Sequence, residues 1–135
     1  MTNNNIRTIE AIRANMNTAH NSRSAWGRGV YVYACDLVDD LAEVLRYDEN
    51  VLDNEKLLRK ALLNGAADWA QYSWGGCSLI YNRDIAERLC TPSELKKTHN
   101  GMRKPNANEE WLDTQARALY QAELLVIEAY REYLK

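Results

Sequence analysis

The chain has 135 residues and a net charge of −2, and 46% of its residues are hydrophobic and 27% charged. This length suits a single domain, residues 1–135, with one buried core. The composition excludes wholesale disorder, and the apolar runs are too short for a membrane-spanning helix. Because the first residues lack the basic and apolar parts of a signal peptide, we expect a soluble cytoplasmic protein.

The cysteines and histidines offer little scope for metal or disulfide chemistry. Cys35, Cys77 and Cys90 are widely spaced and form no CxxC pair, and the chain has two histidines. We therefore predict free thiols, no metal site and no cofactor. Cys77 follows two glycines, and His20 and His99 are its candidate bases. No orienting third residue can be assigned, so no catalytic residue is proposed and the reactivity of Cys77 stays open.

The small net charge hides a strong asymmetry along the chain. Residues 36–55 carry eight acids against the single base Arg46, a local charge of −7. Residues 1–28 and 83–104 each carry a local charge of +3. The electrostatic field is therefore expected to be dipolar.

Helical periodicity organises the first third of the chain. Ile6, Ile9, Ile12 and Met16 follow an Asn run that can cap, which predicts a helix over 5–20. After two glycines, a second amphipathic helix is predicted over 30–47. Its expected buried stripe consists of Val30, Tyr33, Ala34, Leu37, Leu41, Val44 and Leu45, and its expected outer face carries Asp36, Asp39, Asp40 and Glu43.

The remaining chain also reads as helical. Asp53-Asn54 signals a third helix that Gly75-Gly76 stops, with Gly65 either ending it earlier or allowing a close crossing. A short helix is predicted from Asn82 to Leu89, and a second brief one at Thr91-Pro92-Ser-Glu94, which has the pattern of a capping box. A loop over 98–108 precedes a final helix, capped by Asn108, whose expected buried residues are Leu112, Ala116, Leu119, Ala122, Val126 and Tyr133.

We therefore predict an all-α, compact, single-domain helical bundle of about five helices, with an irregular Gly/Trp turn and one basic loop.

The acidic helix is the first candidate site. Asp36, Asp40 and Glu43 stand at i, i+4 and i+7, so their carboxylates share one helix face. The face can be plainly solvated, can bind a basic protein surface, or can hold magnesium for nucleotide hydrolysis. The last possibility needs a facing acidic pair, for which the candidates are Asp84 with Glu87 and Glu123 with Glu128.

Two further candidates lie in the second half of the chain. Trp69 and Tyr72 share a helix face and suit the core, whereas Trp74, Gly75, Gly76 and Tyr81 mark a turn suited to contact with a partner. The basic set Lys96, Lys97, Arg103 and Lys104 can contact phosphates or form a solvated loop. A sequence pI of about 5.7 disfavours a dedicated nucleic-acid binder.

A resemblance covers roughly residues 69–122. The block from Ser73-Trp74-Gly75-Gly76-Cys77 through Thr91-Pro92-Ser-Glu-Leu-Lys-Lys97 to Trp111-Leu-Asp-Thr-Gln-Ala-Arg117 resembles small accessory proteins of gut-bacterial phages and conjugative elements. The resemblance implies a mobile-element context and supplies no active-site residue. Small proteins in such settings often inhibit host defence nucleases, including CRISPR and restriction enzymes.

The leading hypothesis is a non-enzymatic accessory protein that binds a protein partner and inhibits a host defence nuclease through its acidic face. A nucleic-acid-processing complex is one possible partner. The predicted partner-binding residues are Asp36, Asp39, Asp40, Glu43, Trp74, Gly75, Gly76, Tyr81, Arg103 and Lys104. The alternatives are a metal-dependent nucleotide hydrolase that uses Asp36, Asp40 and Glu43, and a direct nucleic-acid-binding protein. The identity of the partner and the oligomeric state stay open.

Overall fold

The computed structural model describes residues 2–22, 28–73, 83–91, 93 and 107–135. In these ranges the chain forms five helices and no strand, which confirms the predicted all-α class: α1 (Asn3–Asn21), α2 (Arg28–Val44), α3 (Glu55–Ser73), α4 (Arg83–Leu89) and α6 (Ala107–Leu134). None of the described helices is both long and apolar enough to cross a membrane. The predicted Gly/Trp turn, the basic loop, and Pro92 and Glu94 of the predicted helix at Thr91–Glu94 lie outside the described residues.

The observed helix ends agree only in part with the caps and bounds predicted from the sequence. The cap of α1 is Thr2, whose hydroxyl accepts a hydrogen bond from the Asn5 N–H at 3.1 Å, and not the Asn run that follows it. Asn54 caps α3 as predicted, because its side-chain oxygen accepts from the Leu57 N–H at 3.0 Å. Helix α2 ends at Val44, three residues before the predicted end, and α6 begins one residue before Asn108, so Asn108 is not its cap.

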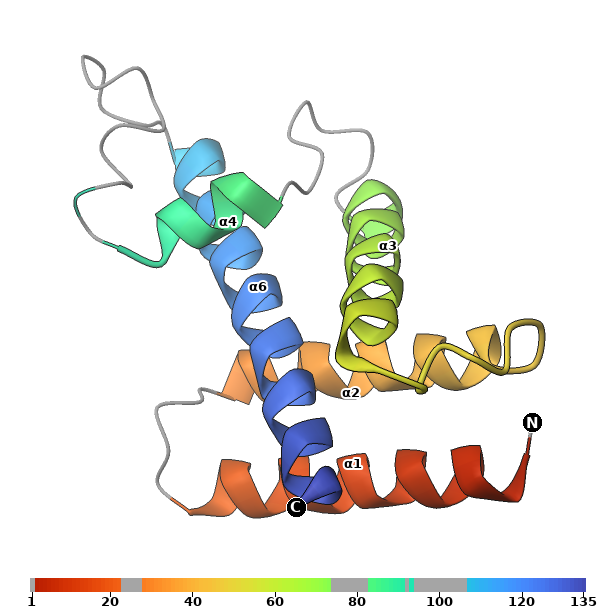
Figure 1. Ribbon diagram of the computed structural model, residues 1–135. Coiled ribbons are helices and arrows are strands. Elements are labelled where there is room, and N and C mark those ends of the chain that lie inside the picture. Colours follow the sequence, from red (N-terminus) through yellow and green to blue (C-terminus); the bar gives the residue numbers. More distant parts are fainter. Residues whose placement is uncertain (1, 23–27, 74–82, 92, 94–106) are drawn as a thin grey trace.

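The helices are arranged around α6. Helices α1 and α2 lie side by side and antiparallel, and α6 crosses both of them while also contacting α3 and α4 (Figure 1). The crossing brings the C-terminal end of α6 against the middle of α1, where the Asn15 amide donates to the Ala129 carbonyl at 3.0 Å. Tyr130 on α6 is buried and donates its hydroxyl hydrogen bond to the Leu52 carbonyl at 3.0 Å, which fixes the turn between α2 and α3.

The predicted buried stripes are largely confirmed, apart from Tyr33, which is half-buried, and Val44 and Tyr133, which are exposed. Ile9, Ile12 and Met16 on α1, and Leu112, Ala116, Leu119, Ala122 and Val126 on α6, are buried in one core. Val44 and Tyr133, both predicted to be buried, are 40% and 41% exposed, and Ile6 and Leu57 are exposed as well. Each of these four residues lies in the first or last two turns of its helix, where the described neighbours no longer cover it.

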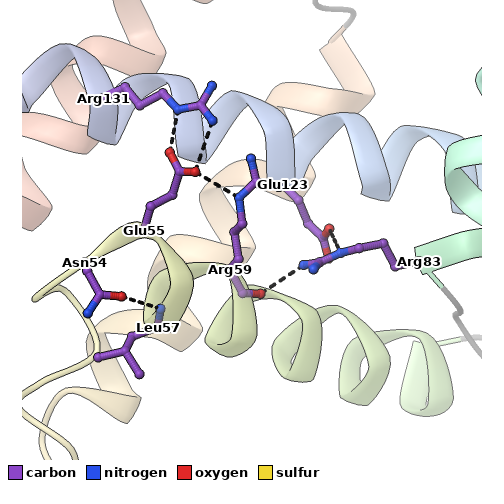
Figure 2. A network of polar contacts seen from close by, with 7 residues as sticks. All are labelled: Asn54, Glu55, Leu57, Arg59, Arg83, Glu123 and Arg131. Carbon is purple, nitrogen blue, oxygen red and sulfur yellow. Dashed lines mark hydrogen bonds and ion pairs between the residues drawn. The ribbon is translucent and has the colours of Figure 1, made fainter.

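A network of charged side chains ties α3 and α4 to α6, as Figure 2 shows. Glu123 on α6 is only 1% exposed, and its carboxylate pairs with the Arg83 guanidinium of α4 at 3.3 Å. The same guanidinium donates to the Arg59 carbonyl of α3 at 2.9 Å. Glu55 at the start of α3 receives two hydrogen bonds from Arg131 of α6, which lower the pKa of this carboxyl.

We predict that Arg83→Met destabilises the protein by about 2–3 kcal/mol, because it removes a guanidinium that is paired with the buried Glu123 carboxylate. Arg83 is 22% exposed, so the loss falls below that of a fully buried pair. Arg131→Met is the matched control and should cost clearly less stability, because the Arg131–Glu55 pair is well hydrated. Urea denaturation followed by circular dichroism measures both values. Equal losses in the two variants would contradict the prediction.

Candidate functional site

Helices α2 and α3 contact each other and cross at a steep angle (Figure 1). The Trp69 ring meets the Tyr33 ring edge-on at 4.7 Å between centroids, and one helical turn further along, Gly65 faces Leu37 and Asp40. Gly65 therefore does not end α3 and lies where the two helices approach each other. A Cβ atom at this position would stand 3.8 Å from the Leu37 side chain, which is an ordinary contact.

An open groove runs between these helices and is called the acidic groove below. It has a volume of about 630 Å³, and its described lining residues come from α2, α3 and the turn that joins them. Its acids are Asp40, Glu43, Asp48 and Asp68, and Lys60 is the single base among the described lining residues. Val44, Tyr47, Val51, Leu57, Ala61 and Trp69 supply its apolar surface.

The structure divides the predicted acidic face of α2 between two environments. Asp39 is exposed and turns toward α1, where its carboxylate forms an ion pair with Arg13 at 2.8 Å. Asp40 and Glu43 are also exposed but line the acidic groove. The prediction that these side chains face water is confirmed for all three, whereas Asp36 is half-buried. Burial raises the pKa of the Tyr33 phenol, and the negative charge of Asp36 raises it further.

Like charges gather at one end of the groove. Partial burial raises the pKa of the Asp40 carboxyl, and the negative charges of Asp36, Asp39 and Asp68 raise it further. Burial and the charge of Asp39 likewise raise the pKa of Asp36. A raised carboxyl pKa means that the folded protein disfavours the ionised form, so at neutral pH this cluster destabilises the free protein. Such clusters in a groove are typical of sites that bind a ligand of opposite charge.

The other predicted contact residues cannot be placed in this site. Trp74, Gly75, Gly76, Tyr81, Arg103 and Lys104, together with Cys77, lie outside the described residues. Trp69 was expected in the core and is half-buried against it, with part of its surface in the groove. Among the described residues, no group of three or more His, Cys, Asp or Glu side chains is arranged to hold a metal ion.

Sequence reasoning missed the α3 side of the groove. Asp68 and Lys60 of α3 were not singled out, and neither was Tyr47 in the turn after α2, although it is 85% exposed. The polar residues Lys60, Asn64 and Asp68 recur every four positions on α3, and this spacing indicates a solvent-facing stripe. That the stripe meets the acids of α2 depends on where α2 and α3 pack against each other, which the spacing does not reveal.

Comparison with known proteins gives no family assignment, since no protein-family model, curated protein or solved structure matches this chain. The candidate site therefore rests on its own geometry, and the resemblance to mobile-element proteins stays a prediction.

We predict that Asp40→Asn stabilises the free protein at pH 7 by up to about 0.5 kcal/mol, a size usual for surface charge changes. The folded-state pKa of Asp40 is raised, so its ionisation opposes folding at neutral pH, and this penalty fades as pH falls through the folded pKa toward the ordinary value of 3.8. The advantage of the variant should therefore disappear below pH 3.8. Thermal melts across this pH range measure it.

Asp39→Asn is the matched control for this measurement. It removes the same charge one position earlier but breaks the ion pair with Arg13, so it should give no gain at pH 7. A gain equal to that of Asp40→Asn would show that only the total charge of α2 matters.

Proposed function

We propose that this protein works by binding a macromolecular partner through the acidic face of α2, and that it inhibits a nucleic-acid-processing enzyme by covering its basic nucleic-acid channel. A host defence nuclease, of the CRISPR or restriction type, is the concrete form of this proposal. The single observation that carries it is the concentration of exposed carboxylates along the α2–α3 groove, where Asp40 faces Asp68.

The charge pattern supports a basic partner. Residues 36–55 have a local charge of −7, and the structure brings Asp68 of α3 to the same surface. A nucleic-acid channel presents Lys and Arg side chains spaced to meet phosphates, and a row of surface carboxylates can meet the same side chains. Electrostatic complementarity of this kind speeds association and selects the partner.

The acidic groove also explains why binding would be favourable for this surface. In the free protein, partial burial raises the pKa of Asp40, and repulsion by the charges of Asp36, Asp39 and Asp68 raises it further. Cationic side chains from a partner would remove the repulsion while forming new ion pairs. Groups that lower the stability of the free protein in this way are expected at functional sites.

The test is inhibition of DNA cleavage by a panel of purified CRISPR effectors and restriction endonucleases. We expect the wild-type protein to inhibit at least one member, and Asp40→Lys/Glu43→Lys to raise the half-inhibitory concentration about tenfold or more, as for charge pairs at interfaces. Inhibition should also weaken as salt rises, because salt screens exposed charges.

Glu10→Lys/Glu128→Lys is the matched control, since both residues are exposed and lie outside the groove. It changes the net charge by the same amount and should leave inhibition within about twofold, since distant surface charges contribute little. If no nuclease in the panel is inhibited, the nuclease proposal fails. If the two double variants lose inhibition equally, the acidic face is not the contact surface.

A further inference from the structure

The α2 and α3 faces that line the acidic groove form two continuous helical stripes. On α2 the stripe is Asp40, Glu43 and Val44, which Tyr47 in the following turn extends, and on α3 it is Leu57, Ala61, Asn64 and Asp68. Residues at these spacings lie one above another along a helix. In the part of the chain that the structure describes, neither stripe is covered by α1, α4 or α6.

One end of the groove is apolar and open to water. Val44, Tyr47 and Leu57 are all exposed there, beside the buried Val51. Single exposed apolar side chains are common on protein surfaces, but three that converge on one groove form a patch of the kind that partners cover. Tyr47 supplies a large contact area with few rotatable bonds, which suits an anchoring contact.

The other end is acidic. Asp40 and Asp68 approach each other there from the two helices, near Gly65, whose missing side chain leaves space between them. Leu57 and Asp68 are eleven positions apart on α3, which corresponds to about 16 Å along the helix axis. The apolar and acidic ends are therefore separated by about three helical turns.

On this basis we propose that the acidic groove binds an amphipathic basic α-helix of a protein partner, about three turns long, with apolar anchors at the Tyr47 end and Lys or Arg at the Asp40–Asp68 end. This inference rests on the proposed function and specifies which part of the partner is bound. A docked helix would lie along the α3 stripe, and its side chains would fill the groove between α3, the C-terminal half of α2 and the turn that joins them.

The chemistry of the groove favours this occupant over others. An extended peptide would need a sheet edge to satisfy its backbone, and the described residues form no strand, whereas a helix satisfies its own backbone groups. Nucleic acid would place phosphates against four carboxylates. A second copy in a two-fold dimer would bring groove against groove and so acids against acids.

The test uses a fluorescein-labelled helical peptide of about 16 residues, built on alanine, with two leucines one turn apart and two arginines two turns further along the same stripe. Fluorescence anisotropy measures its binding to the full chain. We expect saturable binding that Asp40→Asn/Asp68→Asn weakens about tenfold, since two charge pairs are lost. Glu10→Gln/Glu128→Gln, which removes two exposed acids outside the groove, should leave binding within about twofold.

A second peptide, with serine in place of both leucines, separates docking from simple charge attraction. It should bind at least about tenfold more weakly to the wild-type protein, because the apolar end of the groove then stays empty. Thermal melts of both double variants establish that they are folded. Three results would each overturn the inference: no binding of the leucine peptide, equal binding of the two peptides, or equal effects of the two double variants.

The same experiments distinguish the two proposals. Nuclease inhibition by the wild-type protein without peptide binding would reject the helix-binding groove and leave the proposed function in place. Peptide binding with no nuclease inhibited would leave the groove in place and reject the nuclease. Dimerisation that competes with the peptide, or single-stranded RNA that displaces it, would assign the groove to a different occupant and reject the inference.

Discussion

The burial of α6 is the constraint on which the rest of the described structure depends. Each of the other described helices packs on α6, and its buried residues, such as Leu119, Leu125 and Tyr130, form the centre of the core. A helix that is covered from several directions needs apolar residues around much of its circumference. The run from Leu124 to Ile127 meets this need, since three of its four residues are fully buried and Leu124 is partly so.

The position of α6 determines which surfaces remain for function. Helix α2 packs on α1, α3 and α6, and α3 holds α6 through Glu55 and, by way of Arg83, through the Arg59 carbonyl. The faces of α2 and α3 that point away from these contacts are the ones that line the acidic groove. The groove is therefore built on two well-anchored helices, and its carboxylates are held in place by the same packing that forms the core.

The spacing of apolar residues, together with cap and glycine signals, was enough to predict the five described helices, their approximate bounds and most of the core. It failed for Val44 and Tyr133, because a periodic pattern shows which residues share a face but not how far a neighbouring helix extends along that face. The sequence also left Glu123 as a candidate metal ligand, whereas the structure buries this residue against Arg83. Long-range partners of this kind are set by how α4 and α6 pack, which no local pattern encodes.

The acids of α2 show most clearly that tertiary packing decides whether a surface charge is neutralised or repelled by its neighbours. Asp39 and Asp40 are neighbours in the sequence and both are exposed, yet Asp39 pairs with Arg13 while Asp40 meets Asp68 and Asp36. The first arrangement neutralises a charge within the protein, and the second concentrates charge beside apolar surface that is also open to water. A protein under selection for stability alone would more readily neutralise Asp40 than keep it in this setting. The combination of repelling carboxylates and exposed Val44, Tyr47 and Leu57 in one groove is therefore better explained by binding than by folding.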